Sequence, residues 1–354
     1  MGFNRTGCVL FLVGRVVHPG CFATNPTYNN MTTSSAPGKI ILFGEHAVVY
    51  GRPALAVPVT QVHADVEVLD SPRVGIWIEA PDVNLHAEVN SLPSDHPLAA
   101  VINKFYAPLS SPHFRFLKMG GQRGIEIKIT STIPVASGLG SGAAVSVALT
   151  RALSSHLNHP MTDEELNAFV YEIEKIHHGT PSGIDNTVVT YAKPVYFVKG
   201  QPIEMLKVGH PFTIVIADTG ISAPTKESVG DVRRLWMNNK SYWETIFDKV
   251  GIISFTARRA IEAGKPALSN VEAWEVLGEL MNENHTLLQE MTVSSPKLDE
   301  LVNAALRAGA LGAKLSGGGR GGNMIALAQD DQAGAIARSL KEAGAKNTII
   351  TQVA

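Results

Sequence analysis

A glycine- and serine-rich turn occupies residues 134–144, with the sequence PVASGLGSGAA. It follows a strand-like stretch and precedes a helix-like one, so its glycines lie at the start of a predicted helix. Backbone N–H groups at a helix start are free to bind an anion, and the positive end of the helix dipole attracts one. The turn therefore predicts a phosphate site. Its spacing is neither the Walker nor the Rossmann pattern, and a tight turn without a ligand is the alternative.

Three polar residues gather at a short apolar stretch near the start of the chain. Lys39 opens the stretch IILF, Gly44 ends it, and Glu45 and His46 follow at once. A cation, a carboxylate and an imidazole around one strand end form a candidate functional cluster. The alternative is that Glu45 and His46 cap the turn and that Lys39 is solvated.

Two carboxylates are the candidates for metal binding and proton transfer. Glu174 borders the buried face of a predicted helix, and Asp185 ends the turn HHGTPSGID that follows this helix. Carboxylate oxygens suit Mg²⁺, which binds together with phosphates and needs few protein ligands. The pair His177 and His178 is a weaker metal candidate, because adjacent residues on a helix do not face one another.

A third glycine segment, KLSGGGRGGN at residues 314–323, precedes the strand-like stretch MIAL. Glycines allow the backbone to come close to a ligand, and the Arg320 guanidinium could pair with a phosphate. A flexible linker is the alternative, which the flanking strand patterns disfavour.

The elements that must position these residues follow from hydrophobic periodicity. Alternating isoleucines between residues 125 and 129 predict a half-buried strand, and residues 143–153 predict a closely packed helix of small residues. Thr162 and Glu165 form a capping box, which predicts the start of a helix. Five residues at helical spacing predict its buried face: Leu166, Phe169, Val170, Ile173 and Ile176.

Composition limits the function classes. The 354 residues carry a formal net charge of −2, which gives no electrostatic reason to expect a nucleic acid or an anionic membrane as a partner. Both cysteines, Cys8 and Cys21, lie before Met31, so the body is expected to hold no disulfide or zinc–thiolate site. This usage fits a reducing compartment, and we expect a cytoplasmic protein. No stretch reaches the ~20 apolar residues of a membrane span.

The N-terminal residues lack the patterning of the body. Residues 1–34 are predicted to be an extension outside the fold, with strong patterning from Ser35 onward. The apolar run at residues 8–13 fits a signal peptide poorly, because Gly14 and Arg15 interrupt it.

Together, the segments at residues 36–46, 174–185 and 314–323 resemble the motifs of the GHMP small-molecule kinases. They occur in the family's order across nearly all of the chain from Ser35 onward. The first motif is similar to residues 36–46, and the helix-and-turn motif is similar to residues 174–185. The run 217–226 is similar to the branch of the family that phosphorylates mevalonate.

This resemblance implies an α+β fold of two domains. Residues 35–208 would form an N-terminal ATP-binding domain with a left-handed βαβ crossover, and residues 209–354 would form a ferredoxin-like C-terminal domain. ATP, Mg²⁺ and mevalonate are the implied ligands, and they would bind in the cleft between the domains. A homodimer is compatible with the family.

The resemblance also implies a role for each motif residue. Asp185 would accept or orient the proton of the substrate hydroxyl, and Lys39 would neutralise charge on the transferring phosphoryl group. Glu174 and Ser141 would bind Mg²⁺. Substrate contacts would come from Glu45, His46, Thr180 and Ser182. ATP contacts would come from Ser131, Ala136, Ser137, Gly138, Leu139, Gly140, Ser141, Gly142, Gly317, Gly319 and Arg320.

Three positions depart from the family pattern and leave other functions open. Gly142 stands where the family has a serine that binds Mg²⁺, so that Ser141 or a water would replace it. Arg320 interrupts the third motif, and Asn323 stands where the family has cysteine. A sister kinase acting on phosphomevalonate or another small alcohol is one alternative, for which Arg320 would be the added cation. A catalytically inactive sensor is another, which Gly142 favours but the retained Lys39, Glu174 and Asp185 disfavour.

Overall fold

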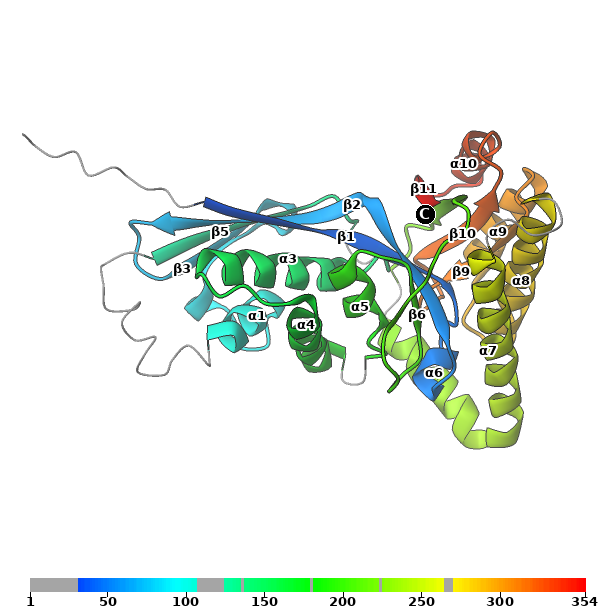
Figure 1. Ribbon diagram of the computed structural model, residues 1–354, viewed down its shortest axis with the longest axis horizontal. Helices are drawn as coiled ribbons and strands as arrows, with labels where there is room; N and C mark the ends of the chain where they lie inside the picture. Colours follow the sequence, from blue (N-terminus) through cyan, green and yellow to red (C-terminus); the bar gives the residue numbers. More distant parts are fainter. Residues whose placement is uncertain (1–30, 107–123, 135–136, 179–180, 223–224, 264–269) are drawn as a thin grey trace, which may run out of the picture.

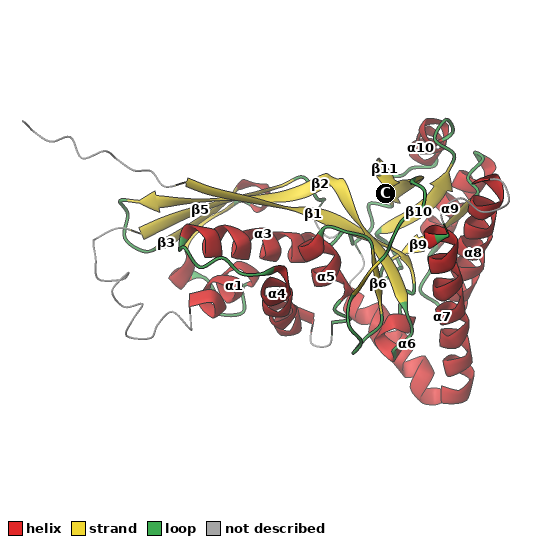
Figure 2. Cartoon of the chain, viewed as in Figure 1, coloured by secondary structure: helices red, strands yellow, loops and turns green. Residues whose placement is uncertain are grey.

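Two sheets with helices packed against them make up the protein (Figures 1 and 2). In this computed structural model the strands of the first sheet all precede residue 206, and those of the second all follow residue 211. The structure describes residues 31–106, 124–134, 137–178, 181–222, 225–263 and 270–354. For residues 177–178 and 270–273 it describes the backbone and not the side chains.

The first sheet has the strand order β4-β3-β5-β2-β6-β7, with β1 paired to β2. Strands β5 and β6 are both antiparallel to β2 and hence parallel to each other. Helices α3, α4 and α5 connect them, and this connection is the predicted βαβ crossover. Figure 1 shows these helices and α1 on one face of the sheet. The strands are β1 (Met31–Phe43), β2 (Ala54–Ser71), β3 (Ile76–Ala80), β4 (Leu85–Glu88), β5 (Gly124–Ser131), β6 (Val195–Phe197) and β7 (Glu204–Met205).

The second sheet is antiparallel, in the order β11-β8-β10-β9. Numbered along the chain from β8, this order is 4-1-3-2, the arrangement of the ferredoxin-like fold that was predicted. Its strands are β8 (Phe212–Asp218), β9 (Gly312–Ser316), β10 (Asn323–Ala328) and β11 (Asn347–Val353). Among the described residues the α-helices are α1 (Pro97–Tyr106), α3 (Ser141–His156), α4 (Asp163–His178), α5 (Ile184–Tyr191), α6 (Thr225–Asn238), α7 (Lys240–Glu262), α8 (Asn270–Glu290), α9 (Pro296–Arg307) and α10 (Ala333–Glu342).

Strand β1 starts earlier than the sequence predicts. Met31 already pairs with Leu69 of β2, and the pairing continues without a break to Pro37. Residues 31–34 therefore lie in the first sheet, and the predicted limit of the extension at residue 34 falls inside a strand.

Helix α4 begins with the predicted capping box. The Thr162 backbone N–H donates to the Glu165 carboxylate at 2.8 Å, and the Glu165 N–H donates to the Thr162 hydroxyl at 3.2 Å. Leu166, Val170 and Ile173 are buried and Phe169 is half-buried, but Ile176 is 53% exposed. The prediction that Ile176 is buried was wrong. At about 100° per residue, Ile176 lies about 90° around the helix from the centre of the buried face.

The two sheets are joined near the end of β1. The ring of Tyr50 stacks on Phe247 of α7 with centroids 4.2 Å apart. Next to it, the Arg52 guanidinium pairs with Asp248 at 2.9 Å and with Glu244, both on α7. The turn after β1 is therefore anchored on α7, which packs against α8, the helix that contacts β9 of the second sheet. Within the described ranges, no helix is both long and apolar enough to cross a membrane.

Candidate active site

The predicted phosphate turn leads directly into α3. Gly138 and Gly140 have φ of 82° and 75°, a left-handed backbone that glycine adopts at low cost. Gly140 is the N-cap of α3, and no side chain caps this helix start. The first N–H groups of α3 have no partner within the helix, so the turn can offer them to an anion. Leu139 is buried, and its carbonyl accepts a 2.9 Å hydrogen bond from the backbone N–H of Lys39.

Lys39 and Asp185 form an ion pair beside this turn. The Lys39 Nζ lies 2.9 Å from the Asp185 Oδ1, and their side chains are 5% and 37% exposed. Asp185 lies in the first turn of α5, which begins one residue earlier than the predicted loop ends. A Cβ at Gly140 would lie 2.7 Å from the Lys39 Cγ, so the glycine makes room for the stem of this lysine. The lysine of this pair is thus buried, and the aspartate is partly exposed to solvent.

Glu174 shares this environment. Its side chain is buried, and its pKa is raised to about 7, mainly by burial and further by the charge of Asp185, with Lys39 acting in the opposite direction. A Cβ at Gly142 would lie 4.0 Å from the Glu174 Oε1. The carboxylate therefore lies near the start of α3. The predicted site residues Lys39, Gly142, Glu174 and Asp185 converge in one place.

Glu45 and His46 connect the first motif to the second sheet. Glu45 is almost fully buried and pairs with Lys314 of β9, which is fully buried. The His46 Nε2 lies 3.1 Å from the Gly318 carbonyl oxygen. Burial lowers the pKa of His46 to about 4; the charge of Arg320 also lowers it and the contact with Gly318 opposes the shift. His46 is therefore neutral at pH 7.

The glycines of the third segment mostly serve the protein's own packing. A side chain at Gly319 would collide with the Val293 carbonyl, and one at Gly321 with the Ile221 carbonyl. At Gly317, by contrast, with φ of 88°, a Cβ would meet open space. The prediction that these glycines let a ligand approach is thus incomplete, because the fold itself requires several of them.

Arg320 and Asn323 hold the third segment to its neighbours. The Arg320 guanidinium pairs with Asp231 of α6, and its backbone N–H donates to the Val293 carbonyl at 2.7 Å. The Asn323 amide donates to the Ser137 carbonyl oxygen. The third segment therefore contacts the phosphate turn through Asn323, whereas the charge of Arg320 is engaged with an aspartate.

The remaining predicted residues lie around these groups. Ser131 ends β5, and its backbone N–H donates to the Asp82 carboxylate at 2.6 Å. The Ser137 hydroxyl donates to the Pro134 carbonyl at 2.8 Å. The Ser182 hydroxyl accepts from the Ile184 N–H at 3.3 Å, beside Asp185. The predictions at Ala136, Thr180 and the side chains of His177 and His178 fall outside the described residues.

Lys314 is a residue that the sequence did not point to as functional. The signal was present, because Lys314 follows a run of small and apolar residues. Its burial and its pairing with Glu45 became visible only in the folded chain.

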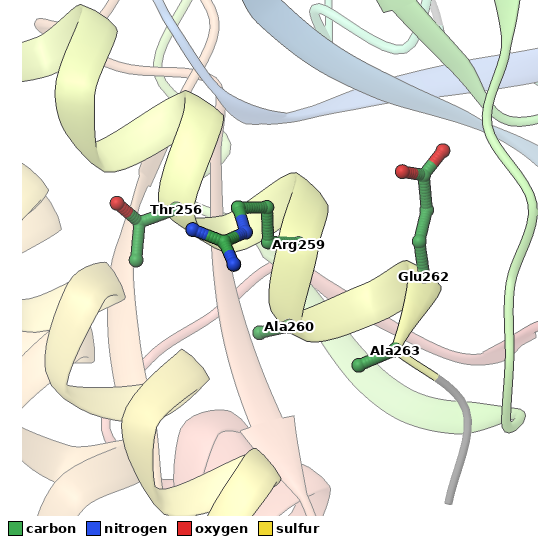
Figure 3. Close-up of a pocket in the computed structure, with 5 residues that line it drawn as sticks. All are labelled: Thr256, Arg259, Ala260, Glu262 and Ala263. Atoms are coloured by element: carbon green, nitrogen blue, oxygen red, sulfur yellow. The ribbon is translucent and has the colours of Figure 1, made fainter. Parts of the chain in front are cut away.

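A separate surface hollow lies along the C-terminal end of α7 (Figure 3). It is lined by Thr256, Arg259, Ala260 and Glu262 of this helix and by Ala263, which caps the helix end. None of these residues is among those that converge around Lys39, so the hollow is not the candidate active site.

Comparison with known proteins places the chain in a family. A model described as the GHMP kinases N terminal domain matches residues 104–193, and one described as the GHMP kinases C terminal matches residues 265–346. The chain is 38% identical over 336 residues to a mevalonate kinase of Thermococcus gammatolerans, covering 90% of this chain and 95% of that protein. It is 37% identical over 325 residues to a mevalonate kinase of Pyrococcus abyssi, covering 89% and 93%.

Solved structures agree on the fold. The L. major mevalonate kinase in complex with R-mevalonate superposes with a TM-score of 0.75 at 30% identity, covering 92% of this chain and 97% of that one. The Streptococcus pneumoniae phosphomevalonate kinase in complex with phosphomevalonate and AMPPNP has a TM-score of 0.72 at 17% identity, covering 90% and 99%, and shows the shared fold alone.

The chain belongs to the GHMP kinases and is an ATP-dependent small-molecule kinase. The two relatives named above, which match at 38% and 37% identity over about nine-tenths of this chain, are mevalonate kinases.

Proposed function

We propose that this protein is a mevalonate kinase, which transfers the γ-phosphoryl group of ATP to the primary hydroxyl of mevalonate and gives 5-phosphomevalonate. The observation that carries the proposal is the 2.9 Å pair of Lys39 and Asp185 beside the uncapped start of α3. The names of the closely matching relatives support the choice of mevalonate.

Phosphoryl transfer depends on positioning and on stabilising charge. The triphosphate would bind along the turn before α3, with Gly138 to Gly142 supplying N–H groups. The hydroxyl oxygen attacks the γ-phosphorus in line, the bond to the bridging oxygen of ADP breaks, and Asp185 accepts the hydroxyl proton. Lys39 holds Asp185 in place and neutralises charge on the transferring group.

Substrate contacts would come from polar groups on the same side of the pair. Ser182, which lies beside Asp185, is one such group, and Thr180 stays a prediction. His46, being neutral at pH 7, would contribute a hydrogen bond and no charge. The carboxylate of Glu45 is engaged with Lys314, so its predicted contact with substrate would be indirect.

The residues near Gly142 fit a magnesium ion. Glu174 presents a buried carboxylate whose pKa burial raises to about 7, and a Cβ at Gly142 would lie 4.0 Å from its Oε1. Glu174 would hold the ion, with Ser141 or a water in place of the family's serine. Bound Mg²⁺ would neutralise phosphate charge. In the described part of the chain no three His, Cys, Asp or Glu side chains form a group that could hold a metal ion.

A phosphorylated substrate is less well supported. Arg320 was the cation that such a substrate would need, and its guanidinium is paired with Asp231. The domain limit at residues 208 and 209, the homodimer and the cytoplasmic location remain proposals from the sequence.

Activity on a panel of acceptors tests the proposal. Purified protein with Mg-ATP is given mevalonate, phosphomevalonate, homoserine or galactose, and ADP release is measured. We expect turnover on mevalonate alone. Turnover only on phosphomevalonate would contradict the substrate, and no turnover on any acceptor would favour a sensor.

Gly142→Ser should restore the hydroxyl that the family carries. Because the new Cβ would lie 4.0 Å from the Glu174 Oε1, we expect the Mg²⁺ concentration for half-maximal activity to fall by about three- to tenfold. Gly142→Ala is the matched control, since it fills the same space without an oxygen. Equal Mg²⁺ dependence of the two variants would contradict metal binding at this position.

Binding of Mg-ATP should release protons from Glu174. With a pKa of about 7, this carboxyl is about half protonated at pH 7, and a metal ligand must be ionised. We expect about half a proton released per nucleotide at pH 7, measured by calorimetry in buffers of different ionisation enthalpy. Equal proton release by wild type and Glu174→Gln would count against Glu174 as a ligand.

The same raised pKa sets a pH dependence of stability without nucleotide. Because the folded pKa is about 7 and the unfolded value is 4.5, the contribution of Glu174 is full below 4.5 and is lost as the pH rises to about 7. Glu174→Gln should therefore remove part of the decrease in the free energy of unfolding between these pH values, measured by urea titration.

A further inference from the structure

A buried ion pair adjoins the candidate active site without belonging to the groups that react. Glu45 follows β1, and Lys314 lies in β9 of the other sheet, 269 residues later. Both side chains are inaccessible to solvent. A buried pair is weak evidence for stability, because desolvating two charges offsets their attraction. Its position therefore needs another explanation.

The contacts of the pair are unequal. The Lys314 Nζ binds the Glu45 Oε1 and also donates to the Leu315 carbonyl at 2.7 Å. The Glu45 Oε2 is buried and has no hydrogen-bond partner among the described residues. The Lys314 ammonium thus has two hydrogen-bond partners, whereas only one oxygen of the Glu45 carboxylate has a partner among the described residues.

Glu45 also lies within electrostatic reach of the catalytic lysine. Burial raises the pKa of Glu45 overall, while Lys314 and, less strongly, Lys39 lower it. Lys39 is therefore within electrostatic reach of three carboxylates, Glu45, Glu174 and Asp185, and it contacts Asp185.

We propose that Lys314 is a positioning residue, which engages Glu45 so that Lys39 stays paired with Asp185. This role rests on the proposed function of the Lys39–Asp185 pair. A buried carboxylate that loses its cation is costly, and it either takes up a proton or pairs with another cation within reach. Without Lys314, that cation is Lys39, whose ammonium would turn from Asp185 to Glu45. Asp185 would then lose its orientation, and the transferring phosphoryl group would lose its cation.

Three variants test the role: Lys314→Met, Glu45→Gln and the double variant. We expect Lys314→Met to lower kcat by about 100-fold with the KM for ATP within about threefold, as misplacement of a reacting group does. The double variant should have a kcat at least about tenfold higher than that of Lys314→Met, because the competing carboxylate of Glu45 is gone. If the pair were only structural, the two single variants would lose kcat equally and the double variant would recover nothing. Either result would overturn the role.

Two measurements keep the test independent of folding and of the substrate. Circular dichroism measures the folded fraction of each variant. If Lys314→Met does not fold, the test compares Glu45→Gln with the double variant, and the role requires that their kcat values lie within about tenfold of one another. A crystal structure of a folded Lys314→Met protein should show the Lys39 Nζ nearer Glu45 than Asp185. If the lysine stays at 2.9 Å from Asp185, the role is wrong, whichever acceptor the enzyme uses. Failure of the wild type to phosphorylate mevalonate would instead overturn the proposed function alone.

Discussion

Asp185→Asn is expected to lower kcat by about 10²- to 10⁴-fold, the range that loss of a positioned general base produces. The amide cannot accept the hydroxyl proton, and it removes the charge that holds the Lys39 Nζ at 2.9 Å. Because Asp185 lies at the start of α5 and not in the turn before α3, the affinity for ATP should stay within about threefold of the wild type.

Steady-state kinetics and calorimetric ATP titration check this result. Asp163→Asn is the matched control, since Asp163 also lies in the first turn of a helix and pairs with a cation, Arg151, at 2.8 Å. That surface pair should contribute little, and its loss should leave kcat near the wild-type value. An equal loss of ATP affinity and kcat in Asp185→Asn would show that Asp185 acts in nucleotide binding.

Gly140→Ala is expected to lower kcat/KM for ATP by about 100-fold, because it disturbs the phosphate turn and the lysine together. The backbone at Gly140 has φ of 75°, where an L-residue costs roughly 1–2 kcal/mol. The new Cβ would also lie 2.7 Å from the Lys39 Cγ, so the lysine stem or the N-cap of α3 must move.

The measurement is the dependence of initial rate on ATP, together with the midpoint of thermal unfolding. Gly334→Ala is the control: it lies in α10, and a Cβ there meets open space, so stability should rise slightly. If Gly140→Ala keeps wild-type kinetics, the turn before α3 does not carry the triphosphate.

Local features were the ones that the sequence predicted well. The capping box at Thr162, the strand that contains Ile127 and the helix after Gly140 depend on residues a few positions apart, and all three are present. The convergence of Lys39, Glu174 and Asp185 was implied by the resemblance to a family, since no local pattern encodes contact across more than a hundred residues. The roles of these residues stay predictions.

Features that depend on distant partners were missed or incomplete. Ile176 has helical spacing but lies at the edge of the stripe that the neighbouring elements cover, so it is exposed. The sequence left Arg320 available to a phosphate, but in the folded chain its guanidinium pairs with Asp231 of α6. Gly319 looked like a ligand contact, yet the Val293 backbone already excludes a side chain there. Each outcome depends on a partner that periodicity along one element cannot identify.

The wide sequence separation of Glu45 and Lys314 has a consequence for the order of folding. A ribosome must add 269 residues after Glu45 before its partner cation exists. The Lys39–Asp185 pair is complete much earlier, and closing a longer loop delays a contact further. A nascent chain that holds only the first sheet would thus contain the Lys39–Asp185 pair and the Glu45 carboxylate without its Lys314 partner. We expect this half to stay loosely packed, and the native arrangement of the lysine to be reached only when synthesis is nearly finished.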